Sequence, residues 1–174
     1  MKIPKFTYHP NPIETGSIIE TTNMCCSCGE KKGLECTASM YSEHDLESIC
    51  PWCVHDGTAA KKFNGEFNDT YQLTDSEVPS DVIDCIAFRT PGFVAWQQPF
   101  WVAHCNDACV FRGEATFTEV KKIKGAALES LLKDNGLDRD MWGDIAQNYQ
   151  TSSTSIYRFD CLHCKEKVYT VDLT

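Results

Sequence analysis

Cysteine is the residue type that most constrains how this chain can fold. The sequence holds 11 cysteines in 174 residues, and pairing them as disulfides would leave one thiol over. Three pairs have the Cys-x-x-Cys spacing, and two of them, Cys25 with Cys28 and Cys50 with Cys53, are separated by 21 residues. Thiolates two residues apart on a tight turn can face one ion, and this gap is typical of four-cysteine zinc sites. We therefore predict that these four cysteines bind one structural zinc ion.

A third close pair, Cys161 and Cys164, needs two further ligands for a second site. Cys105 and Cys109 are the natural partners, because they form the other close pair, and His104 or His163 could substitute for one of them. We predict a second zinc ion that ties the middle of the chain to its C-terminus. Three cysteines are then left without a metal role: Cys26, Cys36 and Cys85.

Four thiolates leave no open position on a zinc ion, which argues for structural rather than catalytic metal. One alternative is a thiol-redox site at Cys50 and Cys53, since the proline between them resembles a redox motif. The upstream pair at zinc spacing argues against it. The histidine that precedes Cys105 could suggest a cysteine nucleophile, but ligation explains Cys105 better. We expect no enzymatic activity.

The charge balance points away from general nucleic-acid binding. The 16 basic and 25 acidic residues give a net charge of -9, so the average field repels polyphosphates. No segment approaches the ~18 consecutive apolar residues of a membrane helix, and residues 1–12 lack the apolar core of a signal peptide. A cytoplasmic protein with reduced thiols is the expectation.

The expected fold class is α+β: a small mixed domain with zinc knuckles of treble-clef or ribbon type, helices in the second half and a C-terminal β-hairpin. We predict a single domain over residues 1–174, with a zinc-binding subregion at 20–63 and a second zinc-linked subregion at 93–174. The N-terminal half is predicted to contain an extended arm, a strand, a short helix started by a capping box and an exposed loop that serves as a hinge, over residues 3–13, 16–22, 42–49 and 63–79.

Helical spacing of apolar residues predicts three helices in the rest of the chain. The first is capped by Ser80 and ended by Pro91-Gly92. The second covers residues 120–132 and stops at Asn135-Gly136, and the third includes Met141 to Tyr149. The strands of the C-terminal hairpin are expected at 156–159 and 168–173, with the Cys161–Cys164 knuckle as its turn.

Several motifs carry a resemblance to a known family. They cover residues 4–12, 25–29, 50–53, 56–63, 89–92, 96–98, 104–109 and 161–164. Together they resemble the bacterial CbrC family over nearly the whole chain. That family has no settled activity, but its name is linked with tolerance to a nuclease colicin, so the resemblance implies protection from toxins.

A protein-binding function of the immunity or antitoxin type is therefore the leading hypothesis, in which an acidic surface covers a cationic toxin domain. The candidate contact residues are Asp69, Asp75, Glu77, Asp81, Asp84 and Trp101. Trp96 is expected in the core. The alternative function is a zinc-ribbon nucleic-acid-binding or regulatory module, which would need the lysines at 61–62 and 121–124 to converge.

Overall fold

The computed structural model describes residues 2–173, so the two outermost residues of the predicted domain, Met1 and Thr174, lie outside the described residues. The N-terminal arm has no regular structure, yet it is packed into the molecule: Phe6 and Tyr8 are buried. The arm leads to β1 (Ile18–Glu20), which pairs antiparallel with β2 (Leu34–Cys36). The predicted strand at 16–22 is thus present.

Four short helices follow in the first half of the chain. They are α1 (Pro51–His55), α2 (Thr58–Phe63), α3 (Tyr71–Asp75) and α4 (Ser80–Arg89). Helix α4 confirms the helix predicted from Ser80. Its C-terminal carbonyls are satisfied by the buried side chain of Asn68, whose amide donates hydrogen bonds to the carbonyls of Ile86 and Thr90.

The helix predicted at residues 42–49 does not form. The Ser42 hydroxyl donates to the carbonyl of Phe63 and accepts from the amide of His44, two residues on, so it stabilises a bend instead of a helix start. The prediction of an exposed loop and hinge at 63–79 is also wrong in part. This segment contains α3, and it anchors itself through the buried side chains of Phe67, Leu73 and Val78.

A three-stranded antiparallel sheet forms the centre of the second half, in the order β5-β6-β7. Its strands are β5 (Val110–Glu114), β6 (Ser155–Asp160) and β7 (Lys167–Asp172). The predicted C-terminal hairpin is confirmed as β6 and β7, and β5 extends it by one strand. Directly before β5, a two-residue turn joins β3 (Ala103–His104) to β4 (Asp107–Ala108).

The predicted helix at 120–132 is split in two, α5 (Phe117–Val120) and α6 (Ala126–Asp134). Gly125 lies between them with φ 61° and ψ −139°, a conformation open essentially to glycine alone, so the apolar period continues across a backbone break. The predicted stop at Gly136 is confirmed. Helix α7 (Arg139–Asn148) confirms the third predicted helix, and the Asp138 side chain caps it by accepting from the amide of Met141.

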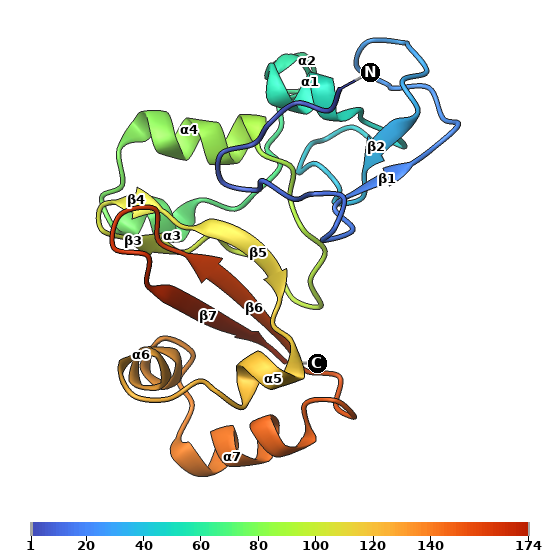
Figure 1. Cartoon of the computed structure of the whole chain (residues 1–174). Coiled ribbons are helices and arrows are strands. Elements are labelled where there is room, and N and C mark those ends of the chain that lie inside the picture. The colour runs from blue at the N-terminus through green and yellow to red at the C-terminus, as the bar shows by residue number, and fades with distance from the viewer. Residues whose placement is uncertain (1, 174) are drawn as a thin grey trace.

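The sheet separates two apolar clusters. One, around Trp101, Phe111 and Phe159, lies between the sheet and α4; the other contains Ile156 and packs α5, α6 and α7 against the opposite face. Figure 1 shows these three helices below the sheet, and β1, β2, α1 and α2 at the far end of the molecule. That far end has its own cluster, which includes Cys25, Cys50 and Cys53. The α+β fold class is confirmed.

Among residues 2–173, no helix has the length and apolar character required to cross a membrane.

Candidate metal centres

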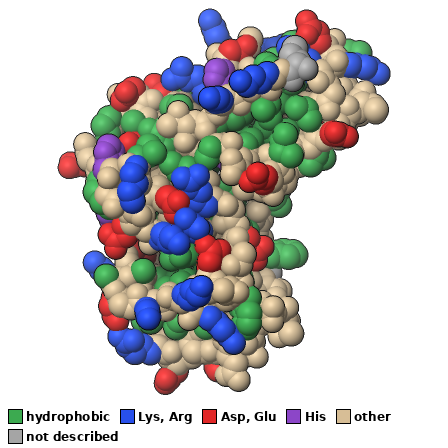
Figure 2. All heavy atoms as spheres, viewed as in Figure 1, with side chains coloured by type: hydrophobic (Ala, Val, Ile, Leu, Met, Phe, Trp, Pro, Cys, Tyr) green, Lys and Arg blue, Asp and Glu red, His purple; other side chains and the backbone are tan. Residues whose placement is uncertain are grey.

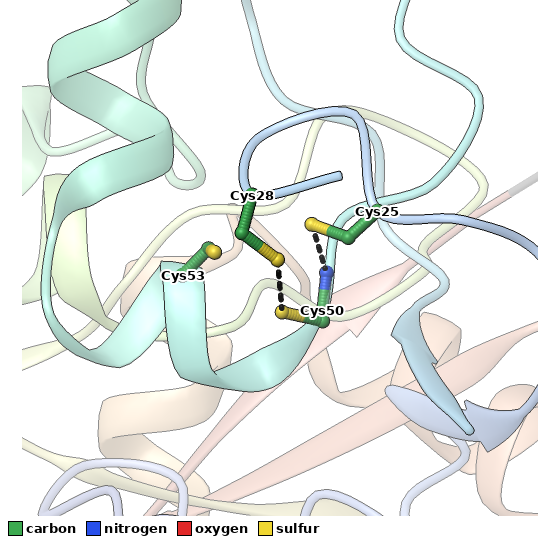
Figure 3. A group of neighbouring side chains, drawn as sticks. All are labelled: Cys25, Cys28, Cys50 and Cys53. Atoms are coloured by element: carbon green, nitrogen blue, oxygen red, sulfur yellow. Dashed lines mark hydrogen bonds between the residues drawn. The ribbon is translucent and has the colours of Figure 1, made fainter. Parts of the chain in front are cut away.

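The first predicted cysteine set comes together as one group. Cys25 and Cys28 lie on the loop after β1, Cys50 is the residue before α1, and Cys53 lies in the first turn of that helix, so that all four side chains point toward one another (Figure 3). Their sulfur atoms lie within 4.8 Å of one another, and Cys28 Sγ is 4.0 Å from Cys50 Sγ. Four sulfurs about 2.3 Å from a zinc ion would be about 3.8 Å apart. The spacing therefore fits one tetrahedral ion.

The loop that carries Cys25 and Cys28 is shaped by backbone hydrogen bonds. The amide of Cys25 donates to the carbonyl of Glu30 at 3.0 Å, and the amide of Gly29 donates to the carbonyl of Cys25 at 2.8 Å. Gly29 has φ 73°, which is why glycine follows the second cysteine. The Lys62 ammonium, from α2, donates to the carbonyls of Cys26 and Ser27 and so holds the outside of the loop.

The pKa values of the thiols in this group are shifted in opposite directions. Burial raises the pKa of Cys25, but hydrogen bonds from the backbone amides of Cys50, Cys28 and Ser27 outweigh it and bring the value to about 7. For Cys50 and Cys53, burial and the negative charge of Cys25 instead raise the pKa. The surroundings thus favour the thiolate of Cys25 and disfavour those of Cys50 and Cys53, and a divalent ion bound among the sulfurs would favour their ionisation.

The second group consists of His104, Cys105, Cys161 and Cys164, whose ligand atoms also lie within 4.8 Å of one another. His104 Nδ1 is 3.2 Å from Cys105 Sγ and 3.4 Å from Cys164 Sγ. Cys105 and Asn106 form the turn between β3 and β4, and both have positive φ, 53° and 56°. This tight turn is what allows two adjacent residues to face the same point.

The partners of His104 select the nitrogen that faces the sulfurs. Its Nε2 lies 3.7 Å from a carboxylate oxygen of Glu166, which leaves Nδ1 for a metal. At 3.7 Å this contact is longer than a hydrogen bond, but it places a carboxylate behind the histidine, as is usual at metal sites. Sequence reasoning did not identify Glu166; its only signal is its place two residues after Cys164.

The Cys161–Cys164 loop repeats the geometry of the first. The amide of Cys161 donates to the carbonyl of Glu166 at 2.9 Å, five residues on, as Cys25 does to Glu30. Lys165 has φ 64° at the position equivalent to Gly29. Burial raises the pKa of Cys161, but hydrogen bonds from the amides of Cys164 and His163 bring it down to about 6. Both loops thus stabilise their first thiolate in the same way.

The second group differs from the prediction at one position: His104 takes the place expected for Cys109. The Cys109 side chain is fully buried in the apolar cluster above the sheet, and burial raises the pKa of its thiol to about 12. Cys109 lies between β4 and β5, beyond the turn that carries Cys105. His163, the other possible substitute, is also outside the group, because its Nε2 contacts Asp107 Oδ2 at 2.9 Å.

The remaining cysteines lie outside both groups, and none of the described cysteines forms a disulfide. The Cys26 thiol donates to the carbonyl of Ser48 at 2.8 Å and accepts from the same residue's amide, so its hydrogen bonds are made with Ser48. Cys36 belongs to β2, where burial raises its pKa. Cys85 is half-buried in α4 and packs against the cluster around Trp101.

The residues predicted to contact a partner divide into exposed and buried ones. Asp75, Glu77, Asp81 and Asp84 are exposed around α3 and α4, whereas Asp69 is half-buried and accepts hydrogen bonds from the amide of Tyr71 and the side chain of Gln98.

The two tryptophans of the segment before β3 are buried and exposed in the opposite way to that predicted. Trp101, predicted at the partner surface, is only 1% exposed, and its indole donates to the carbonyl of Cys109. Trp96, expected in the core, is 67% exposed. The prediction that Trp101 contacts a partner is therefore wrong.

Comparison with known proteins identifies relatives along nearly the whole chain. A family model described as "Uncharacterised protein family (UPF0167)" matches residues 3–173. A UPF0167 protein of Pseudomonas aeruginosa is 39% identical over 175 residues, which cover 99% of this chain and 98% of that protein. UPF0167 proteins of Mycobacterium bovis and Mycobacterium tuberculosis are each 36% identical over 169 residues, which cover 94% of this chain and 89% of theirs. No solved structure matches the chain.

Proposed function

This chain belongs to the UPF0167 family, and on that premise we propose that it is a zinc-stabilised, non-enzymatic protein that binds a cationic protein partner. The two four-ligand groups are consistent with two structural metal ions. Zinc is the ion we assign to them, because four thiolates, or three with one imidazole, are the donor sets of structural zinc sites. Neither set leaves a position free for a substrate.

The observation that carries the proposal is an acidic segment, which we define as residues 64–88. It contains six carboxylates and no lysine or arginine: Glu66, Asp69, Asp75, Glu77, Asp81 and Asp84. None of these forms an ion pair within the part of the chain that the structure describes. Because these carboxylates are not paired with a cation of this chain, a basic partner could pair with them without breaking existing ion pairs.

An exposed aromatic side chain on an anchored loop supports the same proposal. Trp96 and Val94 are 67% and 65% exposed on the loop before β3. The Asp172 carboxylate, itself buried, accepts from the amides of Trp96 and Gln97, and Tyr157 donates to the carbonyl of Val94. An exposed tryptophan on a loop held in place loses little entropy on binding, which is the property of a binding anchor. Gln98 links this loop to the acidic segment through Asp69.

The resemblance to the CbrC family directs the proposal toward a particular kind of partner. Since that family's name is linked with tolerance to a nuclease colicin, we propose a cationic nuclease-type toxin domain as the protein that the acidic segment covers. The thiol-redox alternative has less support, because Cys50 and Cys53 both belong to a four-sulfur group.

The nucleic-acid alternative also has less support. It requires the lysine clusters to converge, but Lys61 and Lys62 lie on α2, at the opposite end of the molecule from the lysines that follow α5 (Figure 1). Lys62 is moreover engaged with the loop of the first metal group.

The test is a binding measurement between the metal-loaded chain and a basic nuclease toxin domain at two salt concentrations. We expect Asp75→Lys/Glu77→Lys to weaken binding by at least about tenfold, and binding to weaken with salt. Glu43→Lys/Glu47→Lys is the matched control, because both residues are exposed and outside the acidic segment. Equal loss in both variants, or recovery of nucleic acid with the chain at moderate salt, would contradict the proposal.

A further inference from the structure

A concavity of about 220 Å³ lies between β7 and the turn that joins α5 to α6. Three lysines form its rim, Lys122, Lys124 and Lys167. Its floor is apolar and consists of Ile123, Ala127 and Tyr169, of which Ile123 and Tyr169 are buried. A preformed apolar floor with a few convergent charged groups is the usual form of a small-molecule site.

The three ammonium groups have no partner of opposite charge: none forms an ion pair with any residue from 2 to 173. Two carboxylates, Glu119 and Glu166, also line the concavity, but both have other partners. Glu119 accepts from Arg158 at 2.7 Å through one oxygen and from Thr116 at 3.0 Å through the other. Glu166 lies behind His104 of the second metal group.

This local excess of positive charge contrasts with a chain whose net charge is -9. On the face shown in Figure 2, lysine and arginine side chains lie in the lower half, where Figure 1 places α5, α6 and β7, as well as at the top of the molecule, with acidic side chains among them. Like charges around one concavity repel one another, and an anion placed among them relieves that repulsion. The apolar floor favours one class of anion over another. An inorganic anion would leave the floor exposed to water, whereas an anion that carries an apolar group would cover it.

We propose that this concavity binds a small organic anion that also carries an apolar group. Its acid group lies among the ammonium groups of Lys122, Lys124 and Lys167, and its apolar part covers Ile123 and Tyr169. The site is separate from the acidic segment and independent of the proposed protein partner. It adjoins the second metal group, since Lys167 directly follows Glu166 at the end of the cysteine loop.

Decanoate is a suitable probe, because it combines a carboxylate with an apolar chain. Titration calorimetry of the metal-loaded full chain is expected to detect decanoate binding, with much weaker binding of acetate, which lacks the chain, and of decyltrimethylammonium, which has the opposite charge. Lys122→Gln/Lys167→Gln is expected to lower the affinity for decanoate by at least about tenfold, because charge-assisted hydrogen bonds are lost.

Lys31→Gln/Lys61→Gln removes the same two charges from exposed positions elsewhere and is expected to change the affinity by less than about twofold. Metal content and circular dichroism establish that both variants fold. The proposal is overturned by absence of decanoate binding, by equal affinity for acetate or decyltrimethylammonium, or by equal loss of affinity in the two double variants.

Discussion

Replacing His104 is expected to lower the metal content, and replacing Cys109 is expected to leave it unchanged. His104 Nδ1 faces the sulfurs of the second group, so His104→Ala removes a ligand and the purified chain should hold one metal ion instead of two. Cys109 is buried outside that group, so Cys109→Ala should keep both ions.

The expected losses of stability also differ in size. Structural zinc sites contribute about 10–16 kcal/mol of binding free energy, which corresponds to dissociation constants of roughly 5 × 10⁻⁸ to 2 × 10⁻¹² M. At about 1 µM free zinc, such a site raises the free energy of unfolding by about 2–8 kcal/mol. His104→Ala should lose most of this. Cys109→Ala removes one small buried group and should lose about 1 kcal/mol.

Elemental analysis of the purified chains gives the number of ions, and thermal unfolding at fixed free zinc gives the difference in stability. Cys105→Ser serves as a positive control, because Cys105 is in the group under either assignment. The reasoning is refuted if Cys109→Ala loses one ion while His104→Ala keeps two.

Three further predictions concern the rest of the fold. Burial lowers the pKa of His9 from 6.5 to about 4, although the hydrogen bond to the Pro91 carbonyl acts in the opposite direction. The unfolded state therefore binds the proton more readily, and stability is lost as the pH falls from 6.5 to 4. At about 1.36 kcal/mol per unit this amounts to about 3 kcal/mol, which His9→Phe should abolish in pH-dependent denaturant unfolding. Trp101→Ala should lower the free energy of unfolding by about 3–5 kcal/mol and Trp96→Ala by less than about 0.5 kcal/mol, and similar losses would contradict their burial. Gly29→Ala should destabilise by about 1–2 kcal/mol because of its φ of 73°, whereas Gly143→Ala, in the interior of α7 with open space around it, should stabilise by about 0.5–1 kcal/mol; calorimetric melting checks the opposite signs.

The first metal group was predictable because its information is local. A Cys-x-x-Cys-Gly sequence specifies the turn, and the second pair begins a helix, so spacing alone brings the four sulfurs together. The second group was predictable only in part. Its ligands depend on a turn in which Cys105 and Asn106 both have positive φ, and nothing in the spacing of Cys105 and Cys109 reveals it. Asn106 was the available signal, since asparagine tolerates that conformation better than most residues.

The tryptophans and helices show where side-chain pattern and backbone disagree. Trp101 lies between Phe100 and Val102, while Trp96 precedes two glutamines, and these neighbours indicate burial and exposure better than residue type does. The prediction of one helix at 120–132 was wrong at Gly125, because the apolar residues keep their helical spacing across the point where the helix is interrupted. The Ser42 prediction failed because the hydroxyl found a carbonyl 21 residues away, a contact that only tertiary structure supplies.

The separation of the apolar clusters has a consequence for how the molecule would come apart. The first metal group belongs to the cluster beneath β1 and α1, and the second lies at the end of the sheet, beside a different cluster. Ions bound at the two groups would therefore stabilise different clusters, and chelation that removes the ion of the more exposed second group first would loosen the sheet end while amides around α1 kept their protection from hydrogen exchange. When metal is scarce, the sheet end of the protein would then lose its structure before the end that contains α1.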